Sequence, residues 1–572
     1  MRNQADHAAE PEALFLNPAR DPGVGFVVPP AFWWHLRDRG VIEGFAASDD
    51  EAMNTRIEAH LRQVKRHRAF TQVAEVNVVP VLLEDAAFRK SYATAGGKAL
   101  LNGAAGARLL NRFGWDRPGM DAEAALGRYF ADCQAVNAGA VLPLGVVPDG
   151  VDFAIDCRNT FNYFHFLTET LSQLCVLDGM AFTGRVFIHF PNHPEKTRTF
   201  VRGFIDALFP ELAGRVVLER APKDYTRVLS AFSFQWTYFQ MPPSVIGSLD
   251  GLAQSDLSWH GHRATRSSRA VLAMNTVEST LLALRARALR AIAGRDVSHL
   301  PKRVYITRAS GHARDRQMQG ETALVELLEA FGFKALAFED LTPLDQIALM
   351  AGAEVMVSAH GAGFANMLFA SPQCTVIEIG TLQTAQIRWG DFWPVAHASR
   401  CRYVSFIADH ACDTPLEVPD FTTAGIVPVR LSDKGLGRVM GFVAALCGHI
   451  PRLHRAADVT RLAGQLLRAG HPDRAEVMLA QHADMRSGNL DLCLAQADLH
   501  KARGEWHAEL IALHAAWAAD PTRWQTLAQV LWCARRIGNT PVQVWAIRLL
   551  QAEFPDRIAD LAKDRDWVQQ LL

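Results

Sequence analysis

The chain has 572 residues, of which 49% are hydrophobic and 21% are charged, a composition typical of a globular protein. This length is too great for one hydrophobic core, so we expect about two to four domains. Because 59 basic residues are balanced by 60 acidic ones, there is no excess of positive charge for non-specific binding of nucleic acid.

Residues 1–70 carry little pattern beyond a helical stretch at 51–67, and we treat them as an N-terminal extension. The next part is mixed α/β. Residues 73–83 and 185–190 are strand-like, whereas 196–209 and 277–293 have the pattern of helices.

Residues 302–380 have the clearest pattern. Four short apolar runs predict strands, and amphipathic segments between them predict helices. Thr342 is the expected N-cap of one of these helices, with Pro343 in its first turn. Strands that alternate with helices at this rate predict βαβ units and a parallel sheet. The strands are 303–307, 334–338, 355–357 and 375–379, and the helices are 321–331, 343–350 and 363–369.

This topology predicts where a ligand would bind. In an open parallel sheet, ligands lie beyond the carboxyl ends of the strands. The residues expected at that edge are a cation, two acids and a glycine turn, a combination that suits the phosphates and ribose of a nucleotide. They are Arg308, Glu339 with Asp340, the segment 358–363, and Gly380.

The glycine turn follows an apolar run that ends in Ser358-Ala359-His360. Gly361 and Gly363 let backbone N–H groups approach an anion, and a helix N-terminus follows them. The alternative is that these small residues only allow a helix and a strand to pack closely. For Arg308, the corresponding alternative is an exposed arginine at the end of a strand.

A second candidate site lies in residues 159–171. If this segment is a helix, Asn162, His165 and Glu169 share one face. A histidine one turn from a glutamate can form an acid–base pair, because the carboxylate orients the ring. The alternative is a structural one, in which Asn162 caps the helix and Glu169 only satisfies His165.

The last part of the chain has an internal period of 34 residues. Each glycine of the series ends one helical pattern and precedes another, and such a helix–turn–helix period is that of tetratricopeptide-like repeats. The positions that obey it are Gly470, Gly504 and Gly538, together with Pro521 and Pro555.

We therefore divide the chain into four parts. They are the extension 1–70, an α/β domain 71–295, a Rossmann-like domain 296–430, and a helical linker with tetratricopeptide-like repeats 431–572.

The cysteines and the amino terminus bear on location. The nine cysteines include no CxxC pair, which suits small buried hydrophobes in a reducing compartment. The polar amino terminus lacks a signal pattern, and no run approaches about 18 apolar residues. We expect a cytoplasmic protein without a membrane span, either free or peripheral at the inner face of the membrane.

Several chemistries lack their motifs. There is no Gly-x-Ser-x-Gly elbow of an α/β hydrolase and no lysine of a Walker motif after the glycines. Histidine spacing is poor for a metal, and no Asp-x-Asp follows a strand. No metal site or cofactor is expected.

Three segments in this order resemble glycosyltransferase family 61. They are Asn162-Tyr-Phe-His-Phe-Leu-Thr-Glu169, Val304-Tyr-Ile-Thr-Arg308, and the block 354–379 around His360-Gly-Ala-Gly363. The resemblance implies a GT-B-like pair of Rossmann-type domains, with the acceptor on 71–295 and the donor on 296–430. It also implies an inverting, metal-independent transfer from a nucleotide sugar, with UDP as the expected nucleotide. One departure is Phe364-Ala365, where family members commonly have Leu then Thr or Ser.

The resemblance implies roles for individual residues. Glu169 or His165 would be the base that takes the proton of the acceptor hydroxyl, and Asn162 would orient or bind the acceptor. The donor would be bound by Arg308, His360, Gly361, Ala362, Gly363, Asn366 and Glu378.

Two functions remain open at this point. The first is a hexosyl- or pentosyltransferase that builds a capsule-like cell-surface polysaccharide, with a protein partner bound through the repeats. The second is a non-catalytic scaffold that keeps a degenerate transferase fold.

Overall fold

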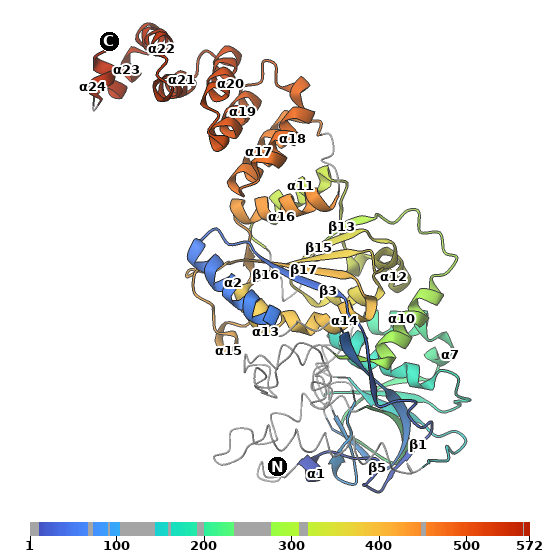
Figure 1. The fold of residues 1–572 in the computed structure, drawn as a ribbon. Coiled ribbons are helices and arrows are strands. Elements are labelled where there is room, and N and C mark those ends of the chain that lie inside the picture. The colour runs from blue at the N-terminus through green and yellow to red at the C-terminus, as the bar shows by residue number, and fades with distance from the viewer. Residues whose placement is uncertain are drawn as a thin grey trace, which may run out of the picture.

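The computed structural model describes two α/β parts and a helical arm (Figure 1). The arm lies at one end of the molecule, a mixed sheet lies at the other, and a parallel sheet lies between them. The described residues are 11–66, 72–89, 92–102, 144–157, 162–191, 199–233, 276–307, 318–447, 453–563 and 565–571.

The mixed sheet of the first part has four parallel strands on one side and antiparallel strands on the other. The parallel strands, in spatial order, are β10 (Val216–Arg220), β9 (Val186–Phe190), β8 (Phe153–Asp156) and β11 (Lys223–Ser233). The antiparallel ones are β5 (Val78–Arg89), β6 (Tyr92–Ala95) and β7 (Lys98–Ala99), with β1 (Val24–Phe26) also on β5. The helices of this part are α6 (Thr199–Leu208), α7 (Pro210–Ala213) and α10 (Ser279–Ala291).

A small second sheet corrects two sequence predictions. Residues 73–83 are not one strand, because the chain passes from β4 (Gln72–Val76) to β5 at Asn77 and so changes sheet. The predicted helix 277–293 begins only at Ser279, because Val277 belongs to β12 (Thr276–Glu278), which pairs with β4. In both places, pairing with a distant strand overrides the local pattern. The third strand of this sheet is β2 (Trp34–Asp38).

The structure confirms the parallel sheet predicted from residues 302–380. Its order is β14-β13-β15-β16-β17, and all of these strands run parallel. Thr342 accepts a hydrogen bond from the Asp345 N–H, as expected of the N-cap of α12. The strands are β13 (Arg303–Thr307), β14 (Lys334–Ala337), β15 (Val355–Ala359), β16 (Thr375–Thr381) and β17 (Arg402–His410), with β18 (Val429–Arg430) antiparallel to β17. The helices are α11 (Glu321–Ala330), α12 (Pro343–Gly352), α13 (Leu382–Ile387) and α14 (Trp393–Ser399).

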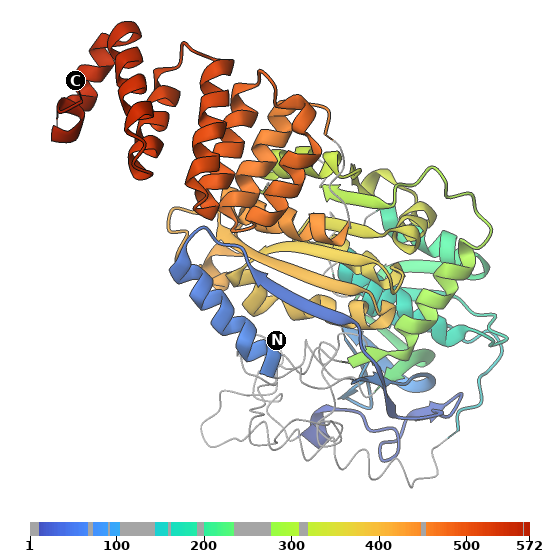
Figure 2. The same cartoon turned by 45° about the horizontal axis from the view of Figure 1, so that its top comes forward.

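The described residues before 70 do not form a separate unit. β3 (Val41–Ala46) adds a further parallel strand beside β17, and Figure 2 shows this blue strand next to the gold ones. The predicted helix that follows is confirmed as α2 (Glu51–Arg66), and its Met53 and Ile57 pack on Ile407 of β17. The described residues 41–66 therefore help to build the parallel sheet.

The parallel sheet is buried on both faces, with residues alternating between two cores. On β13, Val304 and Ile306 face the core shared with the first part of the chain. Tyr305, between them, faces the core shared with the arm. The sheet therefore joins the two ends of the molecule, and only one of its faces is turned toward the first part.

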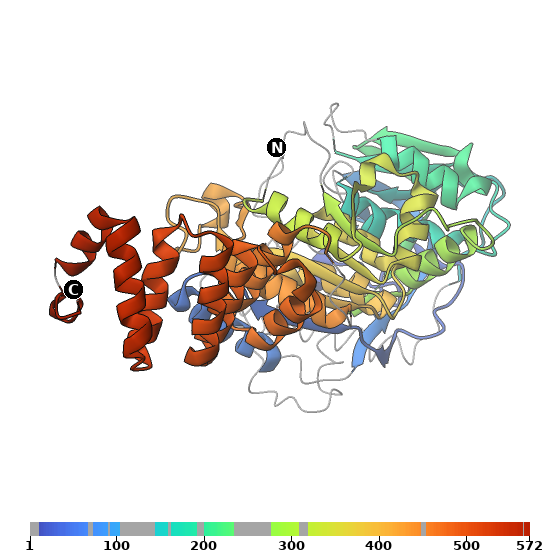
Figure 3. The same ribbon diagram turned by 90° about the horizontal axis from the view of Figure 1, so that it is seen from above.

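The arm is a stack of helices that begins on the second face of this sheet. Gly437 in α16 (Asp433–Leu446) allows the next helix to approach closely, since a Cβ there would lie 2.4 Å from the Gln465 carbonyl oxygen. Figure 3, seen from above, shows the later helices extending away from the sheets. They are α17 (Ala456–Arg468), α18 (Pro472–Gln481), α19 (Leu490–Arg503), α20 (Trp506–Ala519), α21 (Trp524–Arg536), α22 (Thr540–Glu553), α23 (Pro555–Ala562) and α24 (Asp566–Gln569).

The glycines of the 34-residue series have the backbone conformation expected at the end of a helix. Gly470, Gly504 and Gly538 have φ angles of 80°, 72° and 71°, in the left-handed region that favours glycine at the end of a helix. The last part of the chain is therefore helical, as predicted. Its relation to tetratricopeptide repeats remains a prediction, as do the boundaries near 295 and 430 and the GT-B-like pairing.

No helix in the described ranges is both long enough and apolar enough to cross a membrane.

Candidate functional site

The order of the parallel sheet identifies one crevice for a ligand. In chain order, β13 is followed by β14, which lies on one side of it. The next strand, β15, lies on the other side of β13, so the order of the strands reverses there. Ligands bind at such a reversal, beyond the carboxyl ends of the two strands. These ends are Thr307 and Ala359, which lie in the adjacent strands β13 and β15. The next residues in the chain are Arg308 and His360; Arg308 lies outside the described residues, so this prediction is not tested.

The glycine turn presents backbone donors at this crevice. Gly361, Ala362 and Gly363 are partly exposed, and they lead into the 3-10 helix η7 (Ala362–Phe369). Their three N–H groups donate to no acceptor in the described part of the chain, whereas His360 N–H donates to Ile379 and Phe364 N–H to Gly361. Unused N–H groups at the start of a helix favour an anion.

Packing also explains part of this turn. A Cβ on Gly363 would lie 3.3 Å from the ring of Phe338, which is tighter than an ordinary contact. Gly361 has a φ of −179°, which is extended backbone that any residue can adopt. Close packing therefore explains the glycine at position 363. It does not explain why the N–H groups of this partly exposed turn have no acceptor in the described part of the chain.

His360 is held from behind by a buried network. Its Nδ1 contacts Glu378 Oε1, and the hydroxyl of Tyr403 donates to the other oxygen of Glu378. Burial, together with the negative charge of Glu378, raises the pKa of Tyr403 well above its usual value, so this hydroxyl keeps its proton. Because a carboxylate only accepts, the ring of His360 carries its proton on Nδ1. Glu378, predicted to bind the donor, therefore holds His360 in place.

The segment with the second candidate site is helical but irregular. A short α-helical turn, α5 (Tyr163–His165), widens into the π-helical turn η2 (Phe166–Thr170) and then tightens into the 3-10 helix η3 (Leu171–Leu177). π-helical turns are rare and often lie at functional sites. His165 Nδ1 lies 2.7 Å from Glu169 Oε1, so the contact predicted from their spacing exists.

Asn162 is the N-cap of this helix, which is the structural alternative that the sequence left open. Its side chain accepts a hydrogen bond from the His165 N–H at 3.4 Å, as an N-cap does. This contact fixes the start of the helix and hence the position of His165. Asn162 thus orients the pair through the backbone.

The helix of His165 and the segment that follows His360 meet across the boundary between the two α/β parts. Phe392 contacts both: its ring centroid lies 5.5 Å from that of Phe164, the residue before His165, and 5.3 Å from that of His360. Beside this contact, the hydroxyl of Tyr163 lies 2.8 Å from Asn366 Oδ1. The helix of the first part is thereby fixed against the glycine turn of the second.

Asn366, another residue predicted to bind the donor, is fully buried at this boundary. It accepts from Tyr163, whose pKa is raised above its usual value by burial. The second acceptor near Tyr163 is Gln346 Oε1 at 3.1 Å. Gln346 is fixed in turn, because its amide donates to the carbonyl oxygen of Phe338 at 2.9 Å.

A second buried carboxyl group lies near Glu169. Glu278 at the end of β12 is fully buried and accepts a hydrogen bond from Ser233 at 3.0 Å. Burial raises the pKa of Glu278 to about 8, the hydrogen bond from Ser233 opposes this rise, and the charge of Glu169 adds to it. Glu278 is therefore mainly protonated at neutral pH.

Sequence reasoning missed the residues that join the site together. Tyr403 lies on β17, a strand that was not predicted, although the short apolar run in 403–408 is a signal for a buried strand. Phe392 has no such signal. Phe364, the departure from the family pattern, packs its ring 5.3 Å from Phe392 and so belongs to the same aromatic cluster.

Within the described ranges, no group of three or more His, Cys, Asp or Glu side chains could hold a metal ion.

Comparison with known proteins finds one family match, over residues 163–377. The family described as Glycosyltransferase 61 matches residues 163–377. The match spans both the helix of His165 and the turn of His360, and it ends before the arm. No curated protein matches the chain. The match supports glycosyltransferase activity for this part of the molecule.

Proposed function

We propose that the chain is an inverting, metal-independent glycosyltransferase that moves a sugar from a nucleotide sugar, UDP-linked, to a glycan acceptor. The observation that carries this proposal is the set of three unused N–H groups at Gly361 to Gly363. They lie at the reversal point of a parallel sheet, and Phe392 packs against both His360 beside this turn and Phe164, which precedes the His165–Glu169 pair.

The donor side of the site needs to hold a diphosphate. As the sugar leaves, negative charge gathers on the oxygen of the diphosphate, and fixed donors aimed at that oxygen stabilise the transition state. The N–H groups of the glycine turn supply such donors without a metal ion. Arg308, which follows β13 in the chain, would add a guanidinium group at the same edge.

The acceptor side needs a base. In the proposed step the base takes the proton of the acceptor hydroxyl, the oxygen attacks the anomeric carbon, and the bond from that carbon to the diphosphate breaks. The configuration inverts because attack and departure occur on opposite faces of the sugar.

We assign the proton transfer to His165 and the orienting role to Glu169. The side chain of His165 is 12% exposed, whereas that of Glu169 is 3% exposed and lies behind it. Glu169 accepts from Nδ1 of His165, which leaves Nε2 as the basic nitrogen of the ring. A carboxylate in this position also stabilises the imidazolium that forms.

The test separates binding from transfer. Glu169→Gln should abolish transfer to an acceptor while UDP binding, measured by calorimetry, stays unchanged. The matched control is Glu354→Gln, because Glu354 is exposed and pairs with Arg303 at the opposite edge of the sheet. A fully active Glu169→Gln variant would exclude this pair from the reaction.

The setting of the reaction is part of the proposal. We propose that the product is a cell-surface polysaccharide and that the enzyme works in the cytoplasm, at the inner face of the membrane. A scaffold that has lost catalysis would show no thermal shift with any nucleotide or nucleotide sugar, and this result would replace the transferase proposal.

A further inference from the structure

A row of polar side chains leads from the mixed sheet to the His165–Glu169 pair. Ser233 ends β11, and its hydroxyl donates to Glu278 Oε1 at 3.0 Å. Glu278 ends β12 and lies within electrostatic reach of Glu169, which contacts His165 Nδ1 at 2.7 Å. Ser233 and Glu278 are fully buried, whereas the side chains of Glu169 and His165 are 3% and 12% exposed. The row thus starts in the core and ends at the histidine.

The elements that carry this row are fixed against one another. The helix of His165 follows β8, which pairs in parallel with β11, so the ends of both strands lie at one edge of the sheet. The hydroxyl of Thr170 donates to the Asp156 carbonyl at 3.1 Å and ties the π-helical turn to this edge. From the other side, α10 begins directly after Glu278 and packs against η3. The two carboxyl groups therefore cannot move apart freely.

Other titratable groups on the elements around Glu278 are engaged elsewhere. Glu75 of β4 is aligned with the residue before Glu278, so these two carboxyls point to opposite faces of the small sheet. His397 lies on α14, which packs on β12, and its Nδ1 accepts from a backbone N–H at 3.2 Å, which keeps the ring neutral. Arg285 of α10 donates to a backbone carbonyl oxygen at 2.8 Å. Within the described residues, Glu169 is thus the charge that acts on Glu278.

We propose that Glu278 is a positioning residue of the proposed reaction. Its uncharged carboxyl lets Glu169 keep a negative charge, and that charge orients the ring of His165 and keeps Nε2 basic. When Glu278 ionises, two carboxylates repel each other in a buried space, and Glu169 no longer holds the ring in place. This inference rests on the proposed function, because the role of His165 as the base belongs to that function.

The protonation of Glu278 sets the pH at which the change occurs. Burial raises the pKa of Glu278 to about 8, so the carboxyl is uncharged below this pH and charged above it. Transfer that needs the uncharged form should slow above about pH 8, with kcat falling by about tenfold per pH unit. Glu278→Gln stays uncharged at every pH and should lose this fall.

The most direct test observes the ring of His165 itself. The full-length protein is prepared with isotope-labelled histidine and titrated by NMR, and the signals of His165 are identified by their loss in His165→Asn. In the wild type these signals should show a step near pH 8 in addition to the titration of the ring. Glu278→Gln should lose that step. A purely structural role of Glu278 would leave the His165 signals with the same titration in both proteins.

Ser233→Ala provides a second variant with a different expected result. The hydrogen bond from Ser233 favours the charged form of Glu278 and so lowers its pKa. Without this bond the step at His165 should move to higher pH instead of disappearing. The shift keeps the proposal testable even if Glu278→Gln does not fold.

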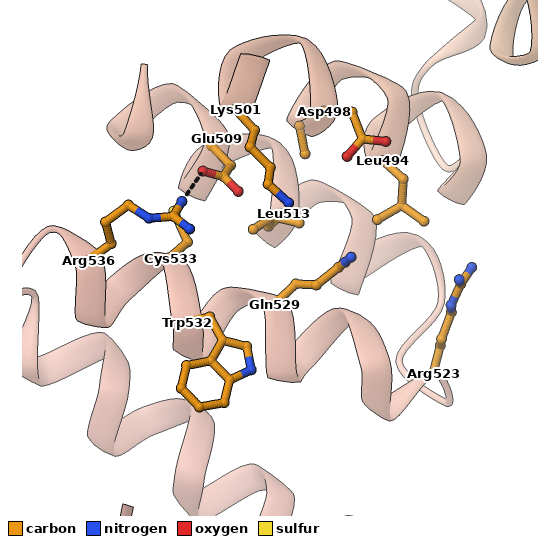
Figure 4. Close-up of a pocket in the computed structure, with 11 residues that line it drawn as sticks. Leu494, Asp498, Lys501, Glu509, Leu513, Arg523, Gln529, Trp532, Cys533 and Arg536 are labelled. Carbon is orange, nitrogen blue, oxygen red and sulfur yellow. Dashed lines mark hydrogen bonds and ion pairs between the residues drawn. The ribbon is translucent and has the colours of Figure 1, made fainter. Parts of the chain in front are cut away.

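A matched control removes an acid elsewhere in the molecule. Asp498 borders a hollow of about 410 Å³ between α19, α20 and α21 of the arm (Figure 4). Desolvation raises the pKa of Asp498, and the charge of Lys501 opposes this rise. Asp498→Asn therefore also removes a carboxyl with a raised pKa, but it should leave the step at His165 in place.

Two results would overturn the proposal. One is a step at His165 that persists in Glu278→Gln, and the other is an equal change in Glu278→Gln and Asp498→Asn. Calorimetry with UDP separates this inference from the transferase proposal. Failure of the transferase proposal would appear as absence of nucleotide binding, while the step and its loss in Glu278→Gln remain.

Discussion

The two α/β parts each contribute a histidine backed by a glutamate, and the two pairs differ in how they are held. In His165–Glu169 both residues lie one turn apart on an irregular helix. In the second pair, His360 directly follows β15 and Glu378 lies within the neighbouring strand β16, and Tyr403 donates to the second carboxylate oxygen. In the proposed mechanism the first pair exchanges a proton, whereas a network whose carboxylate accepts on both oxygens is a rigid support. We therefore expect the first pair to control the rate of the reaction and the second to control the shape of the glycine turn.

The largest expected effect is on catalysis by the first pair. His165→Asn should lower kcat by about 10²- to 10⁴-fold, the range of general base catalysis, while donor affinity changes little. His360→Asn should instead weaken donor binding, because it disturbs the turn that carries the N–H groups. Steady-state kinetics with a titration of donor distinguish these outcomes, and a larger loss of kcat in His360→Asn would reverse the assigned roles.

The next effect is on stability and concerns the second pair. Glu378→Ala removes a buried acceptor from two partners at once and should lower the free energy of unfolding by about 4 kcal/mol. Glu354→Ala, at an exposed ion pair, should change it by less than about 1 kcal/mol. Denaturant unfolding measures both, and similar values for the two variants would show that the network is not a support.

Glu278 allows a pH test of the surroundings of the first pair. Its pKa of about 8 lies above the ordinary value of a glutamate, so the folded chain keeps a proton that the unfolded chain has lost. Stability should therefore fall as the pH rises from about 4.5 to about 8, by roughly 2–3 kcal/mol between pH 5 and 7. Glu278→Gln, which stays neutral, should lose this part of the pH dependence. Parallel curves for the variant and the wild type would contradict a protonated Glu278.

The smallest effects come from removing single hydroxyl groups. Tyr403→Phe takes a donor from a buried carboxylate and should cost about 2 kcal/mol, whereas Tyr163→Phe removes a bond to a neutral amide and should cost about 1 kcal/mol. The second change should also loosen the contact between the two α/β parts. Hydrogen exchange of the backbone around Asn366 measures this, and equal protection in both variants would argue against a link through Tyr163.

Local chemistry made much of the fold predictable. The segment of α12 carries its own start signal in Thr342 and Pro343, and β13 was predicted with the bounds that the structure has. The contact of His165 with Glu169 followed from helical spacing alone.

What depends on distant pairing was not predictable. The role of Glu378 is set by Tyr403, on a strand 25 residues further along the chain. Glu278 was placed in a helix, and only its pairing in a small sheet buries it near Glu169. The strand β3 has no local signal for its place beside β17. Contacts of this kind produce no repeating pattern in the sequence, because the two partners lie far apart in the chain.

Calorimetric titration of the wild-type protein with UDP and a panel of nucleotide sugars is the most direct test of the transferase proposal. The account predicts saturable binding of a nucleoside diphosphate without added metal, retained in Glu169→Gln and weakened in His360→Asn. Absence of heat for every nucleotide and nucleotide sugar at millimolar concentration would contradict it.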